Sequence, residues 1–267
     1  MKKLTLQTCM IAVFIAILVS CHTNGKINSI KLIAHRGGVI ENDSPENSKE
    51  ALLKAVERGY WAVELDTRMT KDSVLITHHD KDFNRYFNLN HQVSEMTWLE
   101  IDSLISESGT KVQKLEDALS LCVEKGLNVM IDNKISGFPL PVFEELISLL
   151  DKYNLRTNAL MIGTTESTEY FTGKIRLSCT RQQIEQNMLR TDYSPNNYYY
   201  FGNPSTEDAK WAAENDIMVV GVINTWALPK ESEQEEVEKI IENLKDNKVE
   251  YIQLDSKYDS CFLTSEK

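Results

Sequence analysis

Two histidines and three carboxylates stand out in this sequence, because each lies in or just after a short apolar or extended segment. The histidines are His35 and His79, and the carboxylates are Glu64, Asp66 and Asp132. Carboxylate oxygens are ligands that Ca²⁺ and Mg²⁺ prefer, whereas structural zinc sites use nitrogen and sulfur. Histidine can accept or donate a proton near neutral pH. These residue types predict a divalent cation with acid–base groups beside it.

Two basic side chains accompany these groups. Arg36 follows the first histidine directly, and Lys134 lies two residues after Asp132. Side chains alternate along a strand, so Glu64 and Asp66 share one side of their strand, as do Asp132 and Lys134 if the strand continues that far. A cation with two basic side chains suits a phosphate diester, whose negative charge grows during displacement.

The elements that must position these residues are short apolar runs alternating with amphipathic stretches. The expected strands are Lys31–Ala34, Trp61–Asp66, Leu127–Asp132, Ala159–Gly163, Lys174–Cys179, Tyr198–Phe201, Ile217–Ile223 and Tyr251–Leu254. The expected helices are Glu46–Arg58, Lys114–Lys125, Pro141–Tyr153, Arg181–Arg190, Thr206–Asn215 and Glu233–Asp246, with a short turn at Ser167–Thr172.

Eight strands with helices between them predict a (β/α)8 barrel. The rival, an open doubly wound sheet, is disfavoured because no G-x-G-x-x-G follows the first strand. A barrel carries its site at the carboxyl ends of its strands, where the charged residues lie. We expect the barrel over residues 30–267, with a small insertion after the second strand at about 81–113 and a helix within it at 96–104.

The first twenty residues have the pattern of a signal peptide. Lys2 and Lys3 precede the eleven-residue apolar run 9–19, which is too short to span a bilayer. Leu18–Cys21 resembles the lipobox of bacterial lipoproteins. We expect residues 1–20 to be removed, Cys21 to be lipidated, residues 21–29 to form a tether, and the protein to be attached to a membrane of the bacterial cell envelope, facing the periplasm or the exterior. The alternative is an ordinary cleaved signal with a chance cysteine.

The composition of the chain limits the kinds of partner and cofactor that we expect. The 267 residues carry 29 Lys and Arg against 40 Asp and Glu, for a net charge of −11. An acidic chain repels the phosphate backbone, so nucleic acid is not an expected partner. Cys122, Cys179 and Cys261 lack C-x-x-C spacing and predict neither a zinc site nor a redox pair. Composition leaves the oligomeric state open.

Several short motifs together resemble the glycerophosphodiester phosphodiesterase family. That family has H-R-G, P-E-N-T, E-x-D, T-K-D-G and H-D, and the chain has His35–Gly37, Pro45–Ser48, Glu64–Asp66, Thr70–Ser73 and His79–Asp80 at similar spacing. Asp132 and Lys134 stand where the family has E-x-K, so one acidic side chain is shorter by a methylene. The family's W-T-x-N is reduced to residues 221–224, with Trp226 following.

The resemblance implies a (β/α)8 barrel of the PLC-like phosphodiesterase type, one Ca²⁺ or Mg²⁺, and hydrolysis of a glycerophosphodiester. The substrate would be glycerophosphoinositol, -choline or -ethanolamine, and the products a glycerol phosphate and an alcohol. It implies that His35 and His79 are the catalytic pair, with the acid and base roles left open. It further implies metal ligands Glu64, Asp66 and Asp132; phosphate-binding residues Arg36 and Lys134; and supporting pocket residues Glu46, Asn47, Asn224 and Trp226.

His79, rather than its neighbour, is the expected catalytic residue, because Asp80 follows it as in the family. His78 would then point to the opposite side of an extended segment, as a surface or packing residue. Glu46 and Asn47 are expected to begin the first helix.

Two other classes of protein remain open. One is a related phosphatidylinositol-specific or sphingomyelinase-D-like phospholipase, although the chain shows no basic amphipathic stretch for a membrane surface. The other is a catalytically silent lipoprotein that binds a ligand, although the intact histidines and carboxylates disfavour it.

Overall fold

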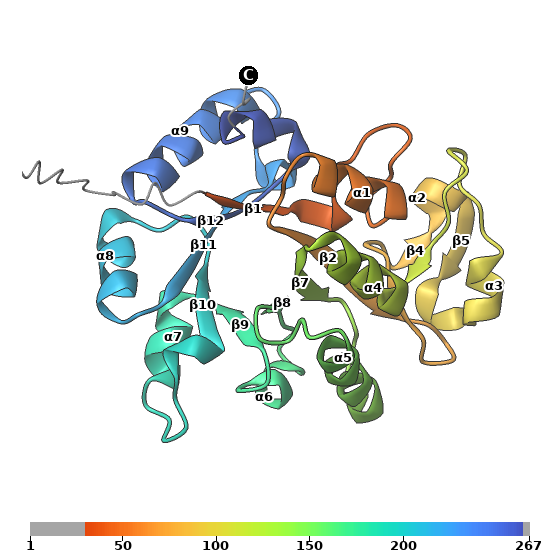
Figure 1. Ribbon diagram of the computed structural model, residues 1–267, viewed down its shortest axis with the longest axis horizontal. Coiled ribbons are helices and arrows are strands. Elements are labelled where there is room, and N and C mark those ends of the chain that lie inside the picture. Colours follow the sequence, from red (N-terminus) through yellow and green to blue (C-terminus); the bar gives the residue numbers. More distant parts are fainter. Residues whose placement is uncertain (1–29, 264–267) are drawn as a thin grey trace, which may run out of the picture.

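The computed structural model describes residues 30–263, and eight of its strands close into a parallel barrel (Figure 1). Each strand pairs in parallel with the next around the ring, and the last returns to the first. The predicted (β/α)8 barrel is therefore confirmed. Its strands are β1 (Lys31–Ala34), β2 (Ala62–Met69), β7 (Asn128–Asn133), β8 (Leu160–Ile162), β9 (Arg176–Cys179), β10 (Tyr198–Phe201), β11 (Met218–Ile223) and β12 (Tyr251–Leu254).

Helices surround this ring of strands in Figure 1 and bury one apolar face each against it. They are α1 (Lys49–Glu57), α4 (Leu115–Lys125), α5 (Leu140–Lys152), α6 (Thr168–Phe171), α7 (Arg181–Asn187), α8 (Thr206–Glu214) and α9 (Glu233–Asp246). Short 3-10 turns lie at η1 (His35–Gly37), η3 (Pro195–Asn197), η4 (Thr225–Ala227) and η5 (Ser256–Cys261).

The expected start of the first helix at Glu46 is wrong. The helix begins at Lys49, because the side chain of Ser48 accepts a hydrogen bond from the Ala51 amide and caps it. Asn47 has a φ of 58°, which a right-handed helix does not allow. Glu46 and Asn47 therefore lie in the loop before the helix.

Alternation along the strands divides the barrel into an apolar interior and a polar mouth. Ile33, Met130 and Tyr199 belong to the cluster inside the barrel, while their strand neighbours pack outward against the helices. Asp66 pairs with Asp132 in the register of β2 and β7. Asp132 lies two residues closer to the carboxyl end of β7 than Met130, which is inside the barrel. The charged side chains are thus brought to the mouth by the same register that buries the apolar ones.

An extension follows β2 and occupies the part of the chain where the insertion is expected. β3 (Leu75–Thr77) runs antiparallel to β2, and β6 (Gln113–Lys114) pairs with β3. Between them lie β4 (Asp82–Phe83), α2 (Asn84–Phe87), β5 (Leu89–Gln92), η2 (Val93–Glu95) and α3 (Trp98–Asp102). This segment, yellow in Figure 1, projects to one side of the barrel and has its own small apolar cluster around Phe83, Val93 and Ile101.

Some expected bounds differ from the structure. The helix expected at residues 96–104 spans only Trp98–Asp102, because Thr97 and Glu100 form a capping box at its start. The helix expected to reach Arg190 ends at Asn187. Within residues 30–263 no helix is both long and apolar enough to cross a membrane. The predicted signal peptide, lipidated cysteine and tether lie outside the described residues.

Candidate active site

Three carboxylates of β2 and β7, two of them buried and one partly buried, form an acidic cluster at the mouth of the barrel. Glu64, Asp66 and Asp132 offer oxygen atoms that lie within 4.8 Å of one another. Glu64 Oε2 accepts a hydrogen bond of 2.6 Å from the Arg36 amide, while the buried Oε1 has no hydrogen-bond partner in the described part of the chain. Burial, reinforced by the charges of Asp66 and Asp132, raises the pKa of Glu64 well above its usual value.

This acidic cluster fits a divalent cation. An orphaned, buried carboxylate oxygen is costly unless a partner binds it, and two neighbouring carboxylates add repulsion. A cation bound by the three side chains would satisfy the orphaned oxygen and offset the repulsion. Oxygen ligands alone suit Ca²⁺ or Mg²⁺. The chemistry of the donor set therefore agrees with the metal that the sequence predicts.

Lys134 and Asn47 hold two of these carboxylates from either side. Lys134 Nζ lies 2.6 Å from Asp132 Oδ2 and 3.3 Å from Asp66 Oδ1. Burial alone would lower the pKa of Lys134, but the neighbouring carboxylates raise it overall, so this lysine is charged. Asn47 Nδ2 donates to Asp66 Oδ2 at 2.7 Å, and Asn47 Oδ1 accepts from the Asp66 amide at 3.1 Å. Asn47 therefore orients Asp66.

The side chain of Arg36 points to another acid. Its Nη1 donates to Glu46 Oε2 at 3.0 Å, while its backbone amide donates to Glu64 Oε2. The φ of Arg36 is 54°, a conformation that turns the chain sharply after His35. Arg36 thus contributes a hydrogen bond to the acidic cluster through its backbone and a positive charge at the mouth through its side chain.

His35 forms the first histidine–carboxylate pair. Its Nδ1 lies 2.7 Å from Asp255 Oδ1, so Nδ1 carries the proton and donates, because a carboxylate only accepts. Asp255 Oδ2 accepts from the Thr225 amide at 2.8 Å and from the Thr225 hydroxyl at 2.7 Å. Although burial alone would raise the pKa of Asp255, these donors lower it to about 2. The Nε2 of His35 is the ring nitrogen left for a substrate.

His79 forms a second pair of the same kind. Its Nδ1 lies 2.9 Å from Asp80 Oδ1, and Asp80 Oδ2 accepts from Arg85 Nε at 2.7 Å. The backbone carbonyl of His79 accepts two hydrogen bonds from the Arg68 guanidinium. Partial burial alone would raise the pKa of Asp80, but Arg85 and then His79 lower it to about 2.

The neighbouring histidine faces away from the acidic cluster. His78 is buried, its Nε2 lies 2.8 Å from the Asp82 carbonyl, and its ring lies 4.8 Å from that of Phe83. Burial lowers the pKa of His78. The structure therefore places His78 in the packing of the extension, not on the surface.

Of the remaining predicted pocket residues, Trp226 lines a cavity beside His35, whereas Asn224 contacts the buried Gln253. Asn224 Nδ2 donates to Gln253 Oε1 at 3.3 Å, and Trp226 is 74% exposed. A cavity of about 290 Å³ lies next to His35, lined by His35, Arg36, Ile40, Thr225, Trp226, Leu228, Lys230, Glu233 and Asp255. This cavity opens directly onto the histidine–carboxylate pair.

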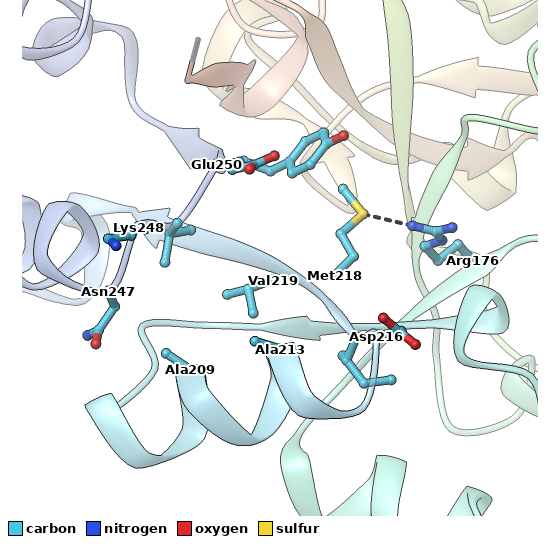
Figure 2. A pocket seen from close by; sticks show the side chains of 12 residues that line it. Arg176, Ala209, Ala213, Asp216, Met218, Val219, Asn247, Lys248 and Glu250 are labelled. Carbon is cyan, nitrogen blue, oxygen red and sulfur yellow. Dashed lines mark hydrogen bonds between the residues drawn. The ribbon is translucent and has the colours of Figure 1, made fainter. Parts of the chain in front are cut away.

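A further cavity of about 390 Å³ lies at the other end of the barrel (Figure 2). Arg176, Met218 and Tyr251, which begin β9, β11 and β12, line it together with residues of α8. None of the predicted site residues reaches it. Chemistry in a barrel occurs at the carboxyl ends of the strands, so this cavity does not belong to the candidate active site.

Sequence reasoning did not assign roles to four residues that hold the histidines: Asp80, Arg85, Thr225 and Asp255. Asp80 enters the family motif only as the neighbour of His79, and Leu254–Asp255 stands where the last strand of the family usually reads T-D. Neither pattern gives these acids a role. Their positions at strand ends were the available signal. Nothing in the sequence marks Arg85, because it lies in the extension, outside the alternating strand pattern.

The fold and the site define a class of protein: a (β/α)8 barrel with a metal-binding carboxylate cluster and two anchored histidines at its mouth. The model of the glycerophosphoryl diester phosphodiesterase family matches residues 35–169, and the chain belongs to this family.

Known relatives resemble the chain over different lengths. A glycerophosphodiester phosphodiesterase of Bacillus altitudinis is 31% identical over 119 residues, which cover 41% of this chain and 48% of that protein. The chain spans about half the length of the curated relatives it matches.

Solved structures match most of the barrel. A glycerophosphoryl diester phosphodiesterase from Parabacteroides distasonis has a TM-score of 0.67 and 20% identity, covering 90% of each chain. An Oleispira antarctica phosphodiesterase in complex with the product sn-glycerol-3-phosphate has a TM-score of 0.58 and 14% identity, covering 85% of this chain and 93% of that one. At these identities the likeness shows the fold alone.

Proposed function

We propose that the protein hydrolyses a glycerophosphodiester to a glycerol phosphate and an alcohol, with one divalent cation at Glu64, Asp66 and Asp132. The observation that carries the proposal is the acidic cluster with its orphaned Glu64 oxygen, set at the same mouth as two histidines that are each held at Nδ1. Family membership agrees with this reading. So does the product bound by the Oleispira antarctica relative.

The two histidines can divide the proton transfers that hydrolysis needs. A P–O bond forms to the oxygen of water, and the P–O bond to the alcohol breaks. One histidine accepts the proton of the attacking water at Nε2, and the other donates a proton from Nε2 to the leaving oxygen. Because both Nδ1 atoms are hydrogen-bonded to carboxylates, Nε2 is the nitrogen that each ring has left for proton transfer. Asp255 and Asp80 stabilise each ring when it is protonated.

Positive charge at the mouth would bind the phosphate. The side chains of Lys134, at the acidic cluster, and of Arg36, at Glu46, are both partly exposed. Charged donors placed where negative charge develops contribute about 10²–10³ in rate each. The bound cation would add Lewis-acid stabilisation of the same charge.

The cavity beside His35 suits the alcohol part of a small, water-soluble diester. Its volume of about 290 Å³ accommodates a polar alcohol such as glycerol, choline, ethanolamine or inositol, and its lining mixes Trp226 with the charged Lys230 and Glu233. Two acyl chains would need a larger apolar surface. This lining favours deacylated substrates over the intact lipids of the related phospholipases.

Chelation tests the proposal most directly. Purified protein is assayed on glycerophosphocholine, glycerophosphoethanolamine and glycerophosphoinositol, with the matching intact phospholipids in parallel and the products identified. We expect cleavage of at least one diester, loss of activity after exhaustive chelation, and recovery with Ca²⁺ or Mg²⁺. Undiminished turnover without metal would overturn the metal assignment, and binding without turnover would indicate a silent ligand-binding protein.

Glu64→Gln provides the matched variant for the same assay. It removes one negative charge from the acidic cluster, so we expect both activity and the metal-induced rise in Tm to be lost. Glu57→Gln removes an exposed glutamate of α1 and should leave both unchanged. A Glu64→Gln enzyme that keeps its metal-dependent activity would contradict the assignment of this ligand.

We also propose that the protein is a lipoprotein of the bacterial cell envelope, attached through Cys21. The support is the lipobox-like Leu18–Cys21 after a short apolar run. Labelled fatty acid should enter the wild-type protein but not Cys21→Ala, which should be released or left unprocessed. Absence of label from the wild type would overturn this proposal.

A further inference from the structure

We propose that Arg85, which α2 of the extension contributes, is a positioning residue for His79. This inference rests on the proposed hydrolysis, because it assigns the support of one of its two histidines. Arg85 Nε donates to Asp80 Oδ2 at 2.7 Å, and Nη1 donates to Glu46 Oε2 at 3.1 Å. Nη2 donates to Glu46 Oε1. One guanidinium therefore joins the carboxylate that holds His79 to an acid in the loop after β1.

The contacts form a continuous chain across the mouth. His79 Nδ1 is bonded to Asp80, Asp80 to Arg85, Arg85 to Glu46, and Glu46 to Arg36. The Glu46 side chain is only 4% exposed, so its charge must be balanced by these two arginines. The extension thereby reaches into the candidate active site through the side chain of Arg85.

Arg85 also provides the positive charge that this group of residues needs. Glu46, His79 and Asp80 offer possible metal-ligand atoms within 4.8 Å of one another, as the acidic cluster does. Both carboxylates of this group bind the guanidinium of Arg85. In the acidic cluster, by contrast, the buried Glu64 Oε1 has no hydrogen-bond partner among the described residues. The guanidinium fills the role that a second metal ion would have.

The geometry of the contact requires a guanidinium. Its Nε donates to Asp80, and its two Nη atoms donate to the two oxygens of Glu46. One planar guanidinium therefore binds two carboxylates at the same time. A lysine carries the same charge but presents it at one point. Arg85→Lys should therefore keep the charge and lose the simultaneous contacts.

Arg85 is not part of the core of the extension. The apolar cluster there is formed by Ile76, Phe83, Val93, Ile101 and Val112, and none of the α2 residues is buried. The antiparallel pairing of β3 with β2 joins the extension to the barrel independently of Arg85. Loss of Arg85 should thus leave the extension folded and release Asp80.

Kinetics on a diester that the wild type cleaves provide the first test. We expect Arg85→Ala and Arg85→Lys to lower kcat by about 10-fold or more, the usual scale for residues that orient a site group, with KM within a few-fold. Millimolar guanidinium should partly restore kcat of Arg85→Ala and leave Arg85→Lys unchanged. Arg190→Ala is the control: Arg190 also bridges two acids, Glu169 and Asp192, and is 34% exposed against 38% for Arg85.

An active wild type with Arg85→Ala within a few-fold of its kcat would overturn this inference and leave the proposed function standing. NMR of protein labelled with ¹⁵N-histidine gives a result that does not depend on activity. His79 should be a single Nδ1–H tautomer in the wild type and Arg190→Ala, and a mixture in Arg85→Ala, with His79→Gln used to assign the signal. An unchanged His79 signal in Arg85→Ala would also overturn the inference.

Discussion

The two histidine–carboxylate pairs at the mouth share one arrangement and differ in what holds the carboxylate. Asp255 is held by two neutral donors of Thr225, in the loop that follows β11. Asp80 is held by a charged guanidinium from the extension. The first pair is therefore built from neighbouring strands of the barrel, whereas the second depends on a segment outside it.

The pairs also differ in exposure. The side chains of His35 and Asp255 are 10% and 21% exposed, while those of His79 and Asp80 are both 27% exposed. Solvent screens the more exposed pair more strongly. Loops of the barrel alone therefore suffice to hold one acid–base group, whereas the other needs an ion-pair network to reach the same geometry.

The largest effect should come from removing either ring. His35→Ala and His79→Ala should each lower kcat by about 10² or more, in the range of lost general acid–base catalysis. His78→Ala is the control: kcat should stay within a few-fold, while Tm falls because the buried ring is lost from its packing against Phe83. Steady-state rates and thermal unfolding of the three variants check this. A large loss of kcat in His78→Ala, with kcat of His79→Ala close to that of the wild type, would reverse the assignment.

Replacing Asp255 or Asp80 should lower kcat to different extents in the two histidine–carboxylate pairs. An asparagine amide can donate to Nδ1 and so favour the wrong tautomer, so Asp255→Asn should lower kcat by about 10-fold or more. Asp80→Asn should lose less, because Glu46 Oε1 lies 4.0 Å from His79 Nδ1 and can accept in its place. The measurement is kcat of both variants on one diester. A larger loss in Asp80→Asn would show that Glu46 does not compensate.

Acid should weaken the fold through the same carboxylates. The pKa of Asp255 and of Asp80 is about 2 in the folded protein, against 3.8 for an unperturbed Asp. Their stabilisation is therefore present above pH 3.8 and lost as the pH falls toward 2. Each shift corresponds to roughly 2 kcal/mol at most, and less for the more exposed Asp80. Urea unfolding across this range should show a shallower loss of stability in Asp255→Asn than in the wild type; equal slopes would contradict the prediction.

The smallest effect should follow from Thr225→Val. It removes the hydroxyl that donates to Asp255 and keeps the backbone amide that donates to the same oxygen. A hydrogen bond to an ionised carboxylate contributes about 1.5–3 kcal/mol to stability. The Thr225 amide and His35 still hold Asp255, so kcat itself should fall by about fivefold at most. A loss as large as that of Asp255→Asn would mean that the hydroxyl alone holds the carboxylate.

The order of the barrel strands could be predicted because it depends on short-range patterns. Apolar runs such as Tyr251–Leu254 have the length of a strand, and the structure starts and ends β12 at the same residues. The convergence of Glu64 and Asp66 followed from the two-residue period of a strand. The start of α1 was missed because Pro45–Asn47 has the composition of a helix start, whereas the positive φ of Asn47 leaves the cap to Ser48.

The barrel and the residues of the acidic cluster could be predicted from the sequence, since each follows from local alternation or from motifs of neighbouring residues. The same motifs favour His79 over His78 as the catalytic residue, which stays a prediction. How the histidines are held depends on tertiary contacts. His35 and Asp255 are 220 residues apart, and Arg85 lies 39 residues from Glu46. Contacts at such separations are made when the ring of strands closes and the extension packs against it, and no local periodicity encodes which side chains then meet.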